Sequence, residues 1–361
     1  MASFLFKKRG GKVTAAAGIL AAAFLLGACS NGTSSETEGT ASSSTTSEDT
    51  AEFQPVTIEH AFGSTTIETK PERVATVAWS NHEVPLALGI VPVGMAKANW
   101  GDDDTDGIHP WTLEALEKLG ADVSAVTLYD ETDALDFEAI AADQPDVIFA
   151  TYSGITAEDY EKLSQIAPTV AYPENPWNTS MEENIRLISK GLGMEAEGEK
   201  LLADIEAKVE AAFAKYPELA GKKVMVSSFG SEADLSKIGF YTTGDPRMGF
   251  LVEAGFDVPD TIEEMSETAE NFWVEVSAEK PELFADVELI VNYGSDDPAE
   301  NAKTLETLQA NPLWSKIPAI KNGNVAFVGT GPVSAAISPS PLATPWVVDK
   351  YFAILSEAVA K

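Results

Sequence analysis

The chain has 361 residues, of which 24 are basic and 57 acidic, so its formal net charge at neutral pH is −33. This charge argues against nucleic acid and anionic lipid surfaces as partners, because both would repel the protein. Hydrophobic residues make up 44% of the sequence, enough for a substantial core, and the length favours two domains over one. Cys29 is the single cysteine of the sequence, which excludes an intramolecular disulfide.

The first 28 residues have the order of a secretory signal peptide. Four basic residues between positions 7 and 12 precede an uncharged, mostly apolar run over 13–28, which is shorter than the ~20 residues that a membrane span needs. The run ends in Leu26-Gly27-Ala28-Cys29. This ending resembles the lipobox of bacterial lipoproteins, which implies removal of residues 1–28, acylation of Cys29 and anchoring to the outer face of the cytoplasmic membrane. The alternative is an uncleaved signal anchor with an incidental thiol.

Residues 29–54 start with this cysteine and continue as a segment rich in Ser, Thr and Glu. Between positions 30 and 51 no apolar side chain is larger than that of alanine, so the segment cannot form a core. It is predicted to be a flexible tether with a root-mean-square reach of roughly 25 Å.

Beyond the tether, short strand and helix patterns alternate. The segments 56–60 and 65–68 alternate apolar and polar residues around a glycine turn, which predicts a β-hairpin. The continuous apolar run 74–78 is typical of a strand buried on both faces of a parallel sheet. Further strands are predicted at 91–95, 125–128, 147–150 and 169–171, and helices at 83–88, 137–142 and 157–166.

A longer helix is predicted at 195–216, where Glu, Lys, Ala and Leu predominate without proline; it would be about 33 Å long. Strand patterns then resume at 224–227, 289–292 and 325–328, with helices at 249–254, 304–310 and 347–360. Strands that alternate with helices favour parallel sheets with right-handed crossovers. The predicted fold class is therefore α/β, with two Rossmann-like lobes around mainly parallel sheets joined by one long helix. The predicted parts are an N-terminal lobe at 55–180, a helical connection at 181–220 and a C-terminal lobe at 221–361.

Several of these segments together resemble a known family. The sequence from Trp79 to Met95, which ends in LALGIVPVGM, is followed about fifty residues later by PDVIFA and then by the long helix. This series is similar to the substrate-binding proteins of iron–siderophore and vitamin B12 ABC importers, the class III periplasmic binding proteins, over most of residues 55–361. The resemblance implies a ligand cleft between two lobes that move little, a monomer, and delivery of the ligand to a dimeric ABC permease.

The segments 172–179 and 240–243 are similar to the iron–siderophore branch of the family. The expected ligand is therefore a ferric siderophore. Vitamin B12, haem and a bare metal ion are alternative ligands, and a surface-anchored enzyme or adhesin on a similar scaffold is an alternative of another class.

Motifs that would indicate catalysis or a resident cofactor are absent or broken. The sequence has no GxSxG, HExxH or Walker A motif. The loop 329–334 begins like a dinucleotide-binding loop, but Ser334 replaces the third glycine, and Pro332 together with Pro339 and Pro341 is expected to leave no helix whose N-terminus could hold a pyrophosphate. Only three histidines are present, and the acidic loop 102–106 lacks the spacing of an EF-hand. We expect no enzymatic activity, no cofactor and no metal site.

Aromatic and amide side chains gather at the predicted strand ends and in the loops that follow them. Ligands of open α/β sheets bind outside the carboxyl ends of the strands, and aromatic faces suit a large amphipathic ligand. The predicted ligand-binding residues are Trp79, Asn81, Trp100, Tyr152, Trp177, Phe229, Tyr241, Arg247, Trp273 and Tyr293.

Arg247 is the predicted polar anchor among them. It is expected in a loop beside Tyr241, where its planar guanidinium would meet carbonyl or oxyanion groups around a ferric centre; the alternative is a salt bridge to a carboxylate. Few other basic residues, Lys97 among them, occur near the predicted cleft. A neutral or cationic hydroxamate complex is therefore favoured over a strongly anionic catecholate.

The resemblance also implies one acidic residue on each lobe that engages the permease. These residues match Glu138 in DFEAIAADQPDVI and Glu279 in VSAEKPELFADVELI. Glu282 is the alternative in the second lobe, because the spacing there needs a gap of one residue. The competing interpretation is that both are ordinary exposed glutamates at helix starts, favoured by the helix dipole.

Overall fold

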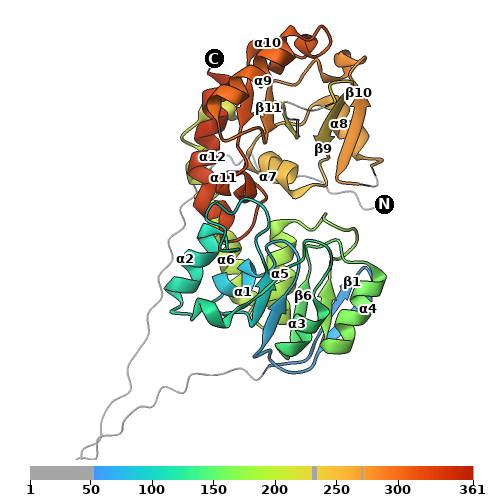
Figure 1. The fold of residues 1–361 in the computed structure, drawn as a ribbon, viewed down its shortest axis with the longest axis vertical. Coiled ribbons are helices and arrows are strands. Elements are labelled where there is room, and N and C mark those ends of the chain that lie inside the picture. The colour runs from blue at the N-terminus through green and yellow to red at the C-terminus, as the bar shows by residue number, and fades with distance from the viewer. Residues whose placement is uncertain (1–52, 230–233, 270, 361) are drawn as a thin grey trace, which may run out of the picture. The chain divides into compact units, whose positions relative to one another are not determined.

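The computed structural model describes residues 53–229, 234–269 and 271–360, which belong to one compact unit, Glu52–Lys361 (Figure 1). The predicted signal peptide, the lipidation site Cys29 and the tether up to residue 52 lie outside the described residues. No helix in the described ranges has both the length and the apolar composition for crossing a membrane.

The N-terminal lobe is built on a parallel sheet. Its described strands lie in the order β5-β4-β3-β6-β7, with the bounds β3 Val74–Thr76, β4 Gly94–Ala96, β5 Thr127–Tyr129, β6 Val147–Ala150 and β7 Thr169–Ala171. Both β3 and β6 are buried throughout, as their continuous apolar sequences predict. The predicted hairpin forms a separate antiparallel pair of β1 (Val56–His60) and β2 (Gly63–Ile67). The helices of this lobe are α1 Glu83–Ala87, α2 Pro110–Lys118, α3 Phe137–Ala142, α4 Ala157–Ile166 and α5 Met181–Gly191, with a 3₁₀ turn, η1, at Val123–Ala125.

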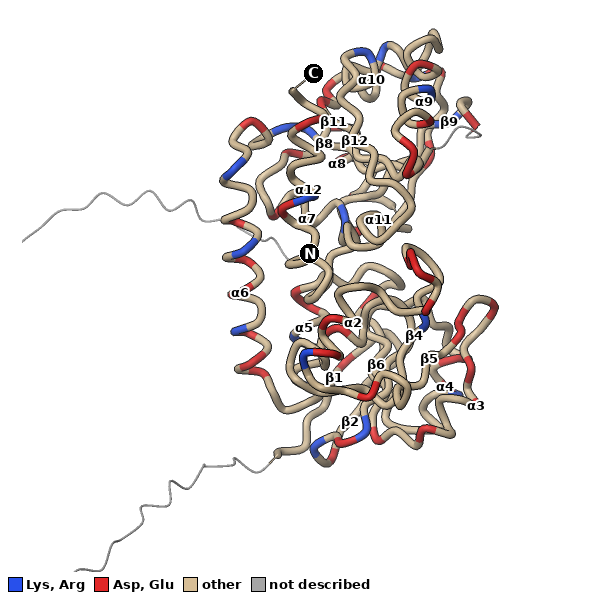
Figure 2. Tube along the Cα trace, turned by 60° about the vertical axis from the view of Figure 1, so that its left-hand side comes forward, with Lys and Arg blue, Asp and Glu red and all other residues tan. Residues whose placement is uncertain are grey.

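Helix α6 (Glu195–Phe213) connects the two lobes and runs beside both of them (Figure 2). It packs on α5 at one end and on α12 at the other. It ends three residues before the predicted Tyr216, because Pro217 starts the 3₁₀ turn η2 (Pro217–Leu219) and disfavours helical backbone at Tyr216, the residue before it, which has φ −128° and ψ 65°. Acidic residues occur on both lobes and along α6, in line with the negative net charge (Figure 2).

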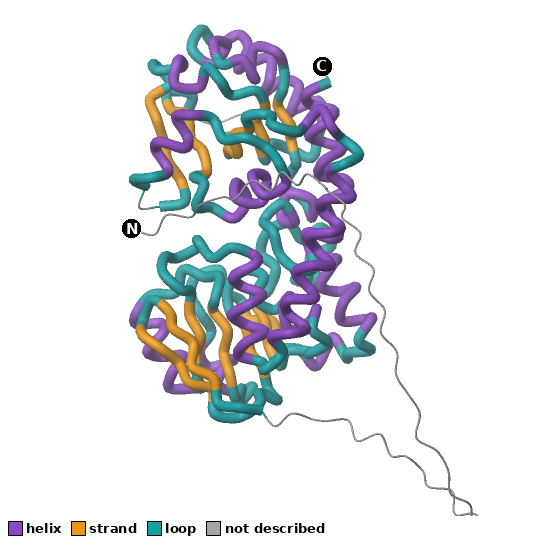
Figure 3. Tube along the Cα trace, turned by 180° about the vertical axis from the view of Figure 1, so that it is seen from behind, coloured by secondary structure: helices purple, strands orange, loops and turns teal. Residues whose placement is uncertain are grey.

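The C-terminal lobe has its own parallel sheet, in the order β12-β11-β8 among the described strands. Figure 3 shows the strands of the two lobes as separate groups. An antiparallel pair, β9 and β10, was not predicted from the sequence. The strands are β8 Val224–Ser227, β9 Lys237–Tyr241, β10 Trp273–Ser277, β11 Leu289–Asn292 and β12 Val325–Phe327. The helices are α7 Pro246–Ala254, α8 Asp260–Ser266, α9 Pro298–Ala310, α10 Pro318–Asn322, α11 Pro332–Ala336 and α12 Ala343–Val359, with 3₁₀ turns η3 Pro281–Phe284 and η4 Trp314–Lys316.

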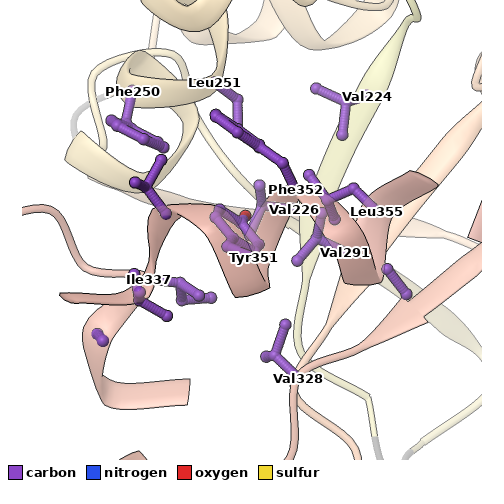
Figure 4. Packing of buried hydrophobic residues seen from close by; sticks show 14 of the residues in the cluster. Val224, Val226, Phe250, Leu251, Val291, Val328, Ile337, Tyr351, Phe352 and Leu355 are labelled. Atoms are coloured by element: carbon purple, nitrogen blue, oxygen red, sulfur yellow. The ribbon is translucent and has the colours of Figure 1, made fainter. Parts of the chain in front are cut away.

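One hydrophobic core cluster of this lobe lies between its sheet and α12 (Figure 4). Val226 and Val291 from the strands pack with Phe352 and Leu355 from the helix, and each of the four side chains is at most 1% exposed. Burial of a side chain of this size stabilises the fold by ~1.5–3 kcal/mol. The fold class predicted from the sequence, two α/β lobes with parallel sheets joined by a long helix, is confirmed.

A buried carboxylate also connects the lobes. Glu83, in the first turn of α1, accepts hydrogen bonds from the N–H groups of Leu342 (2.9 Å) and Ala343 (3.1 Å) at the start of α12 and from the Ser340 hydroxyl (2.5 Å). Its other oxygen accepts from Trp111 Nε1 at 2.8 Å. Burial raises the pKa of Glu83, and these hydrogen bonds oppose the shift. Glu83 thus supplies the N-terminal cap that α12 lacks from its own sequence.

Candidate ligand-binding site

A cavity of about 420 Å³ lies between residues of the two lobes, beyond the carboxyl ends of their strands. Aromatic side chains make up most of its wall. The described residues that line it are Trp79, Trp100, Tyr152, Trp177, Ser228, Tyr241, Arg247, Phe272, Tyr293, Ser334, Ala335 and Ser338. Seven of the ten predicted ligand-binding residues are in this set, whereas Asn81, Phe229 and Trp273 are not.

Trp79 projects into the cavity from a strained turn between β3 and α1. The residues on either side of it, Ala78 (φ 62°) and Ser80 (φ 56°), have left-handed backbone conformations, which cost ~1–3 kcal/mol each in residues other than glycine. Both carboxylate oxygens of Glu131 accept from the Ala78 N–H, at 3.1 and 2.9 Å. The carboxylate of Glu131, which belongs to a neighbouring segment, therefore holds the turn by accepting the hydrogen bond of Ala78.

Asn81 stabilises the same turn from the interior and does not touch the cavity. Its side-chain NH₂ donates to the carbonyls of Val77 (2.7 Å) and Tyr152 (3.0 Å). Its side-chain oxygen accepts from the Tyr152 N–H (3.0 Å) and from the Thr151 hydroxyl (2.9 Å). Through these hydrogen bonds the buried side chain of Asn81 links the segment after β3 to the segment after β6, so its role is structural. The prediction that Asn81 contacts ligand is corrected accordingly.

Tyr152 and Trp177 form the next part of the wall. Their rings meet edge to face at 5.4 Å and 85°. Trp177 lies so close to Gly154 that a Cβ atom there would be 2.2 Å from its Nε1, so only glycine fits at that position. Burial raises the pKa of Tyr152 to about 12, although the Arg247 charge opposes the shift, and the phenol is uncharged at neutral pH.

His109 supports Trp79 and Trp100, two of the aromatic lining residues that the N-terminal lobe contributes. Its ring stacks on Trp111 (4.5 Å, 15°) and meets Trp79 edge-on at 5.3 Å. Its Nε2 lies 2.8 Å from the Trp100 carbonyl, so this nitrogen carries the proton. Burial lowers the pKa of His109, and the hydrogen bond to Trp100 opposes the shift. A buried imidazole therefore positions both Trp79 and Trp100.

Arg247 lies on the opposite wall, in the first turn of α7 and not in a loop as predicted, because Asp245 caps that helix and Pro246 starts it. Its Nε and Nη2 donate to the two oxygens of Asp245 at 2.8 and 2.7 Å, and Nη1 donates to the Tyr293 hydroxyl at 3.0 Å. The guanidinium carbon lies 4.0 Å from the centre of the Tyr241 ring, in cation–π geometry. Arg247 thus both forms a salt bridge and faces the cavity.

The charge of this wall is balanced. Burial alone would lower the pKa of Arg247, but the bonds with Asp245 outweigh it and the pKa lies above its usual value. Asp245 has no exposed surface. Burial also raises the pKa of Tyr241. Among the described lining residues Arg247 is the one charged side chain, and its charge is cancelled by the carboxylate behind it.

Two further predicted residues of the C-terminal lobe, Phe229 and Trp273, do not line the cavity. Phe229 packs edge-on against Trp314 at 5.4 Å in the core. Trp273 covers Gly239, where a Cβ would be 2.1 Å from its ring. Its neighbour Phe272 lines the cavity instead, stacked on Tyr241 at 6.3 Å. Trp273 lies opposite Tyr241 in the β9–β10 pair and meets its ring edge to face at 4.9 Å, so it supports Tyr241 without lining the cavity itself.

Helix α11 contributes Ser334 and Ala335 to the cavity wall and the segment after it contributes Ser338, none of which was predicted from the sequence. The prolines do not prevent a short helix here: Pro332 is the first of the five residues of α11, a position that tolerates proline because its N–H is not needed there. The signal that could have identified these residues was their position after a predicted strand.

The acidic loop 102–106 is mostly exposed to solvent. Asp102, Asp104 and Asp106 bring ligand atoms within 4.8 Å of one another, which is the one such group of three found in the described residues. Their oxygens accept from backbone N–H groups of the same loop, including Gly107 (2.8 Å) and Ile108 (2.7 Å). The loop geometry is accounted for by these hydrogen bonds.

The predicted docking residues are exposed on separate lobes. Glu138 lies in the first turn of α3. Glu279 lies in the turn after β10 and not at a helix start, whereas Glu282 is in the first turn of η3. Both positions in the C-terminal lobe are accessible to a partner.

Glu131 provides a pH-dependent prediction. Burial raises its pKa from 4.5 to about 7, although the hydrogen bond from Ala78 opposes the shift. Well below pH 4.5 the carboxyl is neutral in the folded and the unfolded state. Between pH 4.5 and about 7 it loses its proton more readily in the unfolded state, which lowers the free energy of unfolding. Glu131→Gln stays neutral and can still accept from Ala78. We expect the unfolding free energy of this variant minus that of the wild type to rise from near zero at low pH to on the order of 2–3 kcal/mol above the folded pKa. Urea unfolding at a series of pH values measures it, and a difference that does not vary with pH would contradict the assignment.

Comparison with known proteins agrees with the fold. The sequence profile described as "Periplasmic binding protein" matches residues 74–330. The crystal structure of Streptococcus pneumoniae TIGR4 PiaA in complex with ferrichrome is similar with a TM-score of 0.78 and 44% sequence identity, covering 84% of this chain and 99% of that chain.

Two Bacillus subtilis (strain 168) proteins are similar in sequence. "Probable siderophore-binding lipoprotein YfiY" is 28% identical over 328 residues, which are 88% of this chain and 92% of that protein. "Iron(3+)-hydroxamate-binding protein YxeB" is 26% identical over 293 residues, 80% of this chain and 82% of that protein. With a profile match over more than half of its length, the chain belongs to the periplasmic binding protein family.

Proposed function

We propose that this protein is the extracytoplasmic substrate-binding component of an ABC importer and that it captures a ferric siderophore of the hydroxamate class. The observation that carries the proposal is the aromatic cavity between the lobes, whose single charged lining residue among those described is already neutralised. The similarity to a ferrichrome-bound structure and to a hydroxamate-binding protein supports the same ligand class.

The charge balance favours hydroxamates for a simple reason. Three singly charged hydroxamate groups neutralise a ferric ion, whereas three doubly charged catecholates leave the complex trianionic. A cavity without net charge offers a trianion no compensation for the hydration that it loses on binding. The aromatic faces contribute dispersion and apolar contact, which do not depend on ligand charge.

The proposal includes the setting of the protein. Lipidation of Cys29 would hold the monomer on the outer face of the cytoplasmic membrane, in line with the lipoprotein name of a relative. The bound complex would be released to a permease dimer without chemical change.

Tryptophan fluorescence tests the ligand class, because Trp79, Trp100 and Trp177 line the cavity. Titration with ferric hydroxamates, ferric catecholates, ferric citrate, vitamin B12 and haem should give saturable quenching with a neutral ferric hydroxamate, and that ligand should be recovered unchanged. Saturable binding of B12, haem or a catecholate without binding of any hydroxamate would overturn the proposal.

Docking through Glu138 and Glu279 gives a cellular prediction. Charge pairs across an interface mainly steer association and fix register, so Glu138→Ala/Glu279→Ala should leave ligand affinity unchanged and reduce iron–siderophore uptake on the order of tenfold. The matched control is Glu161→Ala/Glu306→Ala, which removes two exposed acidic residues from the same lobes. Normal uptake by the docking variant at low protein abundance would assign docking to other residues, and loss only with Glu282→Ala would shift the assignment within the second lobe.

A further inference from the structure

Asp245 lies behind Arg247 and outside the cavity lining. Its carboxylate has no exposed surface, while the Arg247 side chain retains 16% exposure and lines the cavity. Asp245 Oδ1 accepts from the backbone N–H (2.9 Å) and Nε (2.8 Å) of Arg247, and Oδ2 accepts from Nη2 (2.7 Å). The pair therefore presents a guanidinium to the ligand and a carboxylate to the protein interior.

The salt bridge between Arg247 and Asp245 leaves N–H groups of the guanidinium available to donate hydrogen bonds. An arginine has five N–H donors, of which Nε, Nη1 and Nη2 each use one in the hydrogen bonds to Asp245 and Tyr293. One N–H therefore remains on each of Nη1 and Nη2. These can bind ligand oxygen atoms without adding net charge to the site.

The neighbouring basic residue does not change this balance. Lys97 lies outside the lining of the cavity and pairs with Asp130 at 3.6 Å. The electrostatic character of the described wall consequently depends on whether the Arg247 charge is compensated.

We propose that Asp245 is a specificity-determining residue, whose buried carboxylate cancels the charge of Arg247 and makes the cavity select neutral ferric complexes over anionic ones. The inference rests on the proposed function and adds the residue that sets its charge preference. A cap for α7 needs only an acceptor oxygen, which asparagine also has. The negative charge of Asp245 is what the selection requires.

Asp245→Asn, Arg247→Gln and the double variant separate charge from packing. The probes are ferrichrome, a neutral trihydroxamate, and the ferric complex of a hexadentate tris-catecholate, with dissociation constants from tryptophan quenching. Asp245→Asn leaves a partly buried cation, so we expect the affinity ratio to shift toward the trianion on the order of tenfold or more, and less at high salt. Arg247→Gln leaves a buried anion and should shift the ratio in the opposite direction. The double variant, with neither charge, should return close to the wild-type ratio.

Asp349→Asn is the matched control, because Asp349 is exposed on α12 and the substitution changes the net charge equally. Its ratio should equal that of the wild type. A folded Asp245→Asn variant with an unchanged ratio would overturn the inference while leaving the proposed function intact. If Asp245→Asn does not fold, an Arg247→Gln ratio that is unchanged or shifted toward the trianion overturns it instead. A wild type that binds neither probe nor any other ferric hydroxamate would overturn the proposed function itself and the inference with it.

Discussion

Glu83→Ala is expected to lower the free energy of unfolding by about 2–4 kcal/mol, because four donors lose their acceptor in the interior. Glu83 is 1% exposed, and its partners are Trp111 Nε1, the Ser340 hydroxyl and the first N–H groups of α12. The substitution uncaps that helix and breaks the only described carboxylate contact between α1 and α12. Equilibrium urea unfolding of the purified protein measures the loss.

Glu83→Gln is the control for the shape of the side chain. It retains one acceptor oxygen, which can serve either α12 or Trp111 but not both, so its loss should be smaller than that of the alanine variant. Equal stability of Glu83→Ala and the wild type would show that water replaces the carboxylate, and the structural role of this contact would have to be abandoned.

Asn81→Leu should be destabilising to a similar extent, by about 2–4 kcal/mol, since leucine keeps the volume but removes every hydrogen bond of the amide. The carbonyl of Val77 and both backbone groups of Tyr152 would lose these partners in the interior. Because Tyr152 lines the cavity, the affinity for a ferric hydroxamate should fall as well.

Asn322→Ala serves as the comparison, because Asn322 is exposed at the end of α10 and its replacement should change stability by no more than about 0.5 kcal/mol. Thermal unfolding and fluorescence titration of both variants measure the two effects. Wild-type stability in Asn81→Leu would contradict the role of this amide as the link between β3 and β6.

Where the sequence carries a continuous apolar run, strand prediction succeeded. The strands 147–150, 169–171, 224–227 and 289–292 have the predicted bounds, because parallel strands buried on both faces have such runs. Helix starts were less predictable. Both α7 and α9 begin earlier than expected, since Asp245 and Asp297 cap them and proline occupies the first position.

The pairing of strands that are far apart in sequence could not be predicted from local sequence patterns. Strand β9 pairs with β10, where Tyr241 lies opposite Trp273, and two helices separate the strands in sequence. A pattern within either segment does not identify its partner. The rule that places ligand residues after strands identified Trp79, Tyr152 and Tyr293, but it could not tell a side chain that faces the cavity from one that faces the interior, as Asn81 and Phe229 show.

The described chain passes between the two sheets once, through α6, and this connection affects the kinetics of ligand binding. Helix α6 contains no proline, and its ladder of hydrogen bonds would have to break for it to act as a hinge. Without a slow closure of the lobes, association becomes a one-step encounter whose observed rate rises in proportion to ligand concentration and does not reach a plateau. Residence time then depends on how quickly the aromatic side chains release the complex, so differences in affinity among ligands would be found in the dissociation rate constant.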